Sequence, residues 1–172
     1  MASERRPDDT ALHFVLDVHL DPKAISEELP VAPITQAARH LPRIAYTGEQ
    51  RNDEDRNHIL QLAFERNATL LSTDIEGMLD KAYGFGPCHS KKHRLGGVII
   101  LPPRRKEKQI AALRSFKDGS LHVLDLDPGD FETIWRDNVG IDLTKKAPKA
   151  VELCDCAYQD DKDARDRRFK RK

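Results

Sequence analysis

The chain has 172 residues, of which 34% are charged and 38% hydrophobic, and its 29 Lys and Arg residues balance its 29 Asp and Glu residues. This length predicts one compact domain with room for an appended segment, and the zero net charge by itself favours no class of partner. The longest aliphatic run, Val98–Leu101, is far too short to span a bilayer, so a membrane protein is excluded.

Strand and helix signals alternate along the chain. In the first half of the chain we expect a strand at 13–18, a helix over about 23–29, a helical stretch that begins at Pro33, a strand at 44–46, a helix that begins after 52–55 and a strand at 68–72. In the second half we expect a strand at 97–101, a helix around 110–116, a strand at 121–126 and a helix over 128–138. Asp127 or Asp130 would cap this last helix. A long loop at 83–96 separates the two halves.

This alternation predicts an α/β fold, a three-layer α/β/α sandwich with a central, mainly parallel sheet. Parallel neighbours need crossover connections, and helices of the observed spacing supply them. The folded domain is assigned to residues 11–140. Residues 141–172 are assigned to a charged C-terminal extension, partly flexible, because no sustained period is visible there.

Acidic residues gather at one predicted edge of this sheet. Asp17 ends the first strand, Asp74 follows the strand at 68–72, and the acids of 53–55 open the helix between them. Ligands of open α/β sheets bind beyond the carboxyl ends of the strands, so we expect these side chains to converge. Clustered carboxylates repel one another, and a hard cation such as Mg2+ or Mn2+ offsets this repulsion. The pattern therefore indicates metal-assisted phosphodiester hydrolysis.

Helix capping is the alternative explanation for most of these acids. The acids of 53–55 are typical of a helix N-terminus, and Asp74 and Glu76 can cap a following short helix. Asp17 differs, because an acid in an apolar strand is unfavourable unless it is paired or bound to metal.

The chain resembles the PIN-like domain family over about residues 12–102. The resemblance is carried by Asp17, by the acidic helix start before Ile59-Leu60-x-Leu62-Ala63, by Leu70–Glu76 and by Gly97–Ile100. The family includes ribonuclease toxins of bacterial toxin–antitoxin pairs. The resemblance therefore implies a Mg2+- or Mn2+-dependent endoribonuclease that acts on RNA, with DNA a less favoured substrate, and an antitoxin protein as partner.

Family roles then fall on Asp17, Asp55 and Asp74 as catalytic metal ligands, with Glu76 as a fourth metal ligand. Asp53 and Asp55 both precede the apolar stripe, and Asp55 is preferred. A catalytically inactive PIN-like scaffold that binds RNA or a protein partner is the alternative function. A homodimer is a candidate assembly, because small nucleases often pair.

A basic segment predicts contact with nucleic acid. From Lys91 to Lys108 the chain carries seven Lys and Arg residues and one acid. We expect Lys91, Lys92 and Arg94 to hold backbone phosphates. A solvated loop and helix face is the alternative explanation.

The N-terminus and the cysteines predict a cytoplasmic protein. The segment MASERRPDDT has no apolar export segment. Cys88, Cys154 and Cys156 are an odd number of cysteines, which favours reduced thiols, and their spacing does not match a zinc site.

Overall fold

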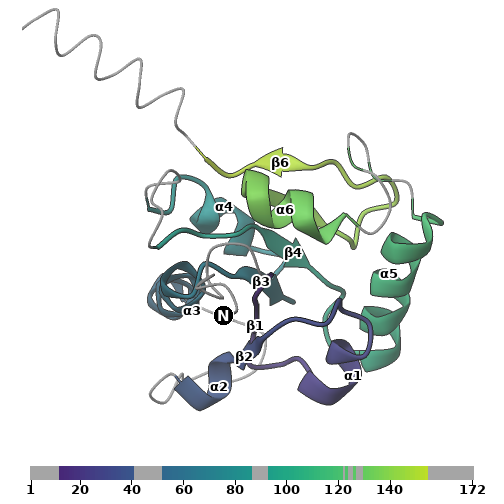
Figure 1. Ribbon diagram of the computed structural model, residues 1–172, viewed down its shortest axis with the longest axis horizontal. Coiled ribbons are helices and arrows are strands. Elements are labelled where there is room, and N and C mark those ends of the chain that lie inside the picture. The colour runs from purple at the N-terminus through teal and green to yellow at the C-terminus, as the bar shows by residue number, and fades with distance from the viewer. Residues whose placement is uncertain are drawn as a thin grey trace, which may run out of the picture.

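The computed structural model describes residues 12–40, 52–86, 93–121, 123, 126 and 130–154 (Figure 1). The strands are β1 (Phe14–Leu16), β2 (Ile34–Gln36), β3 (Thr69–Ser72), β4 (Val98–Ile100), β5 (Val139–Asp142) and β6 (Val151–Glu152). The helices are α1 (Pro22–Ser26), α2 (Ala37–His40), α3 (Asp53–Glu65), α4 (Met78–Ala82), α5 (Lys106–Asp118) and α6 (Phe131–Asp137). Within these ranges, no helix is long and apolar enough to cross a membrane.

The strands form one six-stranded sheet in the order β2-β1-β3-β4-β5-β6. All neighbouring pairs from β2 to β5 are parallel, and β6 pairs antiparallel with β5. Of the described strands, β1 comes first in the sequence, and β2 and then β3 are added on its two sides. The order of the strands therefore reverses between β1 and β3, and this is where open parallel sheets bind their ligands.

Helices cover both faces of this sheet. Successive strand residues point to opposite faces, so Phe14 and Leu16 pack with α1, α5 and α6, whereas Val15 packs with α3 and α4. Phe131 makes edge-on aromatic contacts with both Phe14 and Phe116, which ties α5 and α6 to β1. The prediction of an α/β fold with a mainly parallel sheet is confirmed, and the two covered faces are compatible with a three-layer sandwich.

The segment after Pro33 differs from its prediction. Residues 34–36 form strand β2, which pairs with β1 in parallel, and the helix α2 begins only at Ala37. Ile34 and Thr35 are β-branched and favour a strand, and pairing with β1 outweighs the helical spacing of the apolar residues. The strand predicted at 44–46 lies outside the described residues.

The sheet also continues past residue 140, where the sequence predicted the domain to end. β5 runs to Asp142, and Leu143 and Leu153 beyond it are buried in the core. Asn138 turns the chain from α6 into β5 in a left-handed conformation with φ 53°, and its side chain accepts a hydrogen bond from the Gly97 backbone N–H at 3.2 Å. Of the strand predicted at 121–126, residues 121, 123 and 126 are described, and none lies in a strand.

Cys154 corrects the prediction of reduced thiols, because it is disulfide-bonded. The other cysteines, Cys88 and Cys156, lie outside the described residues. Sequence spacing does not reveal which distant segments meet. Here the Gly84 backbone N–H donates to the Leu153 carbonyl at 2.8 Å, which brings the segment before Cys154 against the chain that follows α4.

Asn52 caps the helix that carries several of the candidate acids. Its side-chain oxygen accepts a hydrogen bond from the Asp55 backbone N–H at 2.8 Å. Replacing Asn52 by Ala is expected to lower the free energy of unfolding by about 1 kcal/mol, because this N–H then loses its partner. Urea denaturation measures the change, and Asn52→Ser, which keeps a capping oxygen, is the control. Equal stability of the alanine variant and the native protein would contradict this role for the cap.

Candidate functional site

The candidate site lies at the carboxyl edge of the sheet, where the strand order reverses. Asp17 directly follows β1, Thr73 and Asp74 follow β3, and the first turn of α3 begins at the same edge. Asp17, Asp55 and Asp74 are all buried or nearly so, with exposed fractions of 1%, 8% and 8%. The topology therefore brings together the elements that carry the predicted acids.

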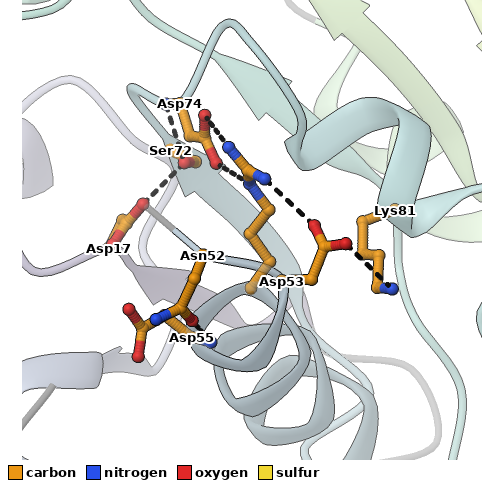
Figure 2. Close-up of polar contacts among 8 residues, drawn as sticks. Asp17, Asn52, Asp53, Asp55, Ser72, Asp74 and Lys81 are labelled. Carbon is orange, nitrogen blue, oxygen red and sulfur yellow. Dashed lines mark hydrogen bonds and ion pairs between the residues drawn. The ribbon is translucent and has the colours of Figure 1, made fainter. Parts of the chain in front are cut away.

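Ser72 links two of these acids. Its hydroxyl donates a hydrogen bond to the Asp17 carboxylate at 2.6 Å and accepts one from the Asp74 backbone N–H at 3.1 Å (Figure 2). The other Asp17 oxygen accepts from the Val18 backbone N–H at 2.7 Å. These bonds hold the Asp17 carboxylate in one orientation at the end of β1.

Arg56 neutralises Asp74. The guanidinium of Arg56 donates to the two carboxylate oxygens of Asp74 at 2.6 and 3.4 Å, and the two side chains are only 13% and 5% exposed. The hydrogen bond to Asp74 raises the pKa of Arg56 above its usual value, so Arg56 stays positively charged. A Cβ on Gly77 would lie 2.5 Å from the guanidinium carbon, so the missing side chain at Gly77 leaves the space that Arg56 occupies.

Asp53 and Asp55, of which the sequence analysis preferred Asp55, have different surroundings. The Asp53 side chain is 68% exposed and forms ion pairs with Arg56 at 3.1 Å and Lys81 at 3.8 Å. The dashed line at Asp55 in Figure 2 ends on its backbone nitrogen, and its carboxylate points away from Asp74. The Asp55 carboxylate makes no hydrogen bond or ion pair with any described residue, although it is nearly buried. Of the two, Asp55 is the acid without a counter-charge in the described part of the chain.

The donor atoms at this edge suit a hard divalent cation. Asp17, Asp55 and Asp74 offer only carboxylate oxygens, which Mg2+ and Mn2+ prefer. The ion pair between Arg56 and Asp74 indicates that a positive charge is favourable beside these acids. In the part of the chain that the structure describes, no three His, Cys, Asp or Glu side chains are arranged as a group that could hold a metal ion. Joint binding of one ion by these acids therefore requires Arg56 to leave Asp74 and the side chains to close in.

A cavity of about 450 Å³ opens beside Asp74. Its walls come from the chain after β1, β3 and β4 and from the start of α5; they are His19, Asp21, Thr73, Asp74, Ile75, Glu76, Pro103, Arg104, Lys106 and Gln109. The predicted ligand Glu76 is exposed in this cavity, whereas Asp17 and Asp55 are not among its lining residues. The cavity size is that of a small-molecule or nucleotide site.

Of the predicted phosphate-binding residues, only Arg94 is described, because Lys91 and Lys92 lie outside the described ranges. Arg94 donates to the carbonyl oxygens of Trp135 and Arg136, both at 2.8 Å, and stacks on the Trp135 ring at 4.5 Å. Burial lowers the pKa of Arg94. Its guanidinium thus stabilises the C-terminal end of α6, and its binding of nucleic acid stays a prediction.

Sequence reasoning missed Arg56 and Gln109. Both lie on the apolar face of a helix, because Arg56 precedes Ile59 and Leu60 by three and four positions and Gln109 precedes Leu113 by four. A polar residue at the start of a buried face needs a partner inside the protein. A polar residue on an otherwise apolar helix stripe was therefore the signal in the sequence that could have identified both residues.

Comparisons with known proteins do not identify the chain. No protein-family model, curated protein or solved structure matches it.

Proposed function

We propose that this protein is a metal-dependent, PIN-like endoribonuclease whose acids at the carboxyl edge of the sheet bind Mg2+ or Mn2+. The observation that carries the proposal is Asp55, a nearly buried carboxylate without a partner among the described residues, on the helix that begins beside Asp17 and Asp74. A buried carboxylate without a counter-charge is unfavourable, and a bound cation would offset it.

Asp17, Asp55 and Asp74 would hold the ion, with Glu76 as a further ligand from the cavity wall. The bound cation would polarise the phosphodiester and supply a hydroxide from water at neutral pH. Ser72 orients the Asp17 carboxylate through its 2.6 Å hydrogen bond. Arg104 and Lys106 line the cavity next to Asp74, where their positive charge attracts backbone phosphates.

The test is a cleavage assay with one labelled RNA strand and a DNA strand of the same sequence. We expect cleavage of RNA with Mg2+ or Mn2+ and none after the metal is removed with EDTA. Cleavage that continues at the same rate in EDTA would contradict the metal-dependent mechanism. Binding to an antitoxin protein stays a prediction from the family resemblance. A gene for such an antitoxin is expected in the reading frame next to the gene of this chain.

The second candidate function is a non-catalytic PIN-like scaffold that binds RNA or a protein. The ion pair between Arg56 and Asp74 favours it, because it satisfies one of the acids without metal. Titration with Mn2+ separates the two functions. A nuclease has a Mn2+ site from which EDTA removes the ion, whereas a scaffold has none.

A further inference from the structure

The start of α5 builds one wall of the cavity. Pro103, Arg104, Lys106 and Gln109 all line the cavity, and α5 has 13 residues. The N-cap residue Arg105 makes no side-chain hydrogen bond to the helix. The N-cap side chain therefore leaves the first N–H groups of α5 uncapped, and helix N-termini of this kind attract anions.

Gln109 is a second and independent feature of this wall. It is only 3% exposed and shares the buried face of α5 with Leu113 and Phe116. Its carboxamide makes no hydrogen bond with any residue that the structure describes. The Gln109 carboxamide is nevertheless not shut off from open space. Among the described residues, the one buried side-chain polar atom that is both unpaired and shut off in this way is Arg66 Nε. The Gln109 carboxamide therefore reaches the space of the cavity that this residue lines.

Facing the cavity, this amide has only water as a partner among the described groups, and a ligand oxygen that accepts its hydrogen bond can replace that water. The surrounding groups limit what this ligand can be. The uncapped start of α5 offers only donors, and Arg104 and Lys106 add positive charge. These groups suit a ligand that only accepts hydrogen bonds and carries negative charge.

The acids of the cavity do not all oppose such an anion. Lys106 pairs with Asp21 at 3.2 Å, and this hydrogen bond lowers the pKa of Asp21. Asp74 is paired with Arg56. Glu76 is the remaining acid of the lining, and it is exposed, so water and salt screen its charge.

We propose that the start of α5 and Gln109 form a phosphate-binding subsite. The Gln109 amide and the first backbone N–H groups of α5 donate to phosphoryl oxygens, while Arg104 supplies positive charge and Lys106 offsets the charge of Asp21. On the proposed nuclease function, on which this role rests, the subsite anchors a phosphate of the RNA strand next to the one that is cleaved. A free phosphate presents the same oxygens, so the experiment compares both sources.

The test is an NMR titration of the full chain in EDTA, so that it requires neither metal nor cleavage. The probes are inorganic phosphate, a dinucleotide with one internal phosphodiester, and a nucleoside without phosphate. We expect both phosphate-containing probes to shift the Gln109 side-chain NH2 signal and the backbone N–H signals of Lys106 and Glu107. The dinucleotide is expected to bind more tightly than inorganic phosphate, and the nucleoside to leave these signals unchanged.

Gln109→Met keeps the size of the side chain and removes its hydrogen bonds, so we expect affinity for the dinucleotide to fall about tenfold. Gln61→Met, on the exposed face of α3, is the matched control and is expected to bind as the native protein does. If Gln109→Met fails to fold, Lys106→Gln tests the same wall from its exposed rim. Four results would overturn the proposal. The α5 signals stay unchanged, inorganic phosphate binds more tightly than the dinucleotide, the nucleoside causes equal shifts, or both glutamine variants lose equal affinity. Loss of cleavage with intact α5 shifts would contradict the nuclease function alone.

Discussion

Replacing Asp17 by Asn is expected to reduce metal-dependent RNA cleavage about a thousandfold. A metal ion supplies several kcal/mol of charge stabilisation, and each 1.36 kcal/mol corresponds to about a factor of ten in rate. Asp17 is the most buried of the three acids, and Ser72 and the Val18 backbone N–H fix its orientation. The neutral amide keeps the size of the side chain but removes the charge that would hold the ion. Initial cleavage rates at saturating Mn2+ measure the effect.

Two controls separate loss of chemistry from loss of fold. Asp80→Asn makes the same chemical change on the exposed face of α4 and is expected to leave cleavage unchanged. Thermal unfolding followed by circular dichroism shows whether Asp17→Asn is folded at the assay temperature. Native cleavage rates in a folded Asp17→Asn protein would exclude Asp17 as a metal ligand.

Replacing Arg56 by Gln is expected to lower the free energy of unfolding of the metal-free protein and to raise its affinity for metal. Removing one partner of a buried ion pair leaves the other charge uncompensated, at a cost of about 3 kcal/mol in unfolding free energy. The same change frees the Asp74 carboxylate, so affinity for Mn2+ is expected to rise about tenfold. Urea denaturation with and without Mn2+ and calorimetric titration measure the two effects. Added Mn2+ should restore most of the lost stability, because it binds the folded state.

Lys81→Gln is the matched control, because it removes one positive charge from the same surface without touching Asp74. Among the described residues, the Lys81 ammonium forms an ion pair only with the exposed Asp53 carboxylate, at 3.8 Å, so little change is expected in either measurement. If Arg56→Gln binds Mn2+ no more tightly than the native chain, Arg56 does not compete with metal at Asp74. If neither protein binds Mn2+, the scaffold function is favoured instead.

Local patterns predicted the elements that bury long apolar stripes or runs. The stripe from Ile59 to Ala63 and the run Val98–Ile100 appear in the structure as α3 and β4. Residues 34–36 and β5 were missed because pairing with neighbouring strands, which lies outside any local window, decides their structure. Gly140 within β5 also weakens its strand signal.

The carboxyl-edge placement of Asp17 and Asp74 follows from the parallel sheet and was predictable. What the acids contact there was not, because it depends on side chains from other elements. Arg56 reaches Asp74 from 18 positions away, and Ser72 reaches Asp17 from 55 positions away. Asp55 was preferred over Asp53 from the sequence, and the structure separates them by the burial of Asp55 and by the ion pairs of the exposed Asp53.

The most direct test of the metal site is anomalous diffraction from crystals of the native chain soaked in Mn2+. We expect one strong anomalous peak bounded by Asp17, Asp55 and Asp74, with carboxylate oxygens about 2.1 Å from the ion and Arg56 moved off Asp74. An intact pair between Arg56 and Asp74, with no anomalous peak between these three acids at saturating Mn2+, would contradict it.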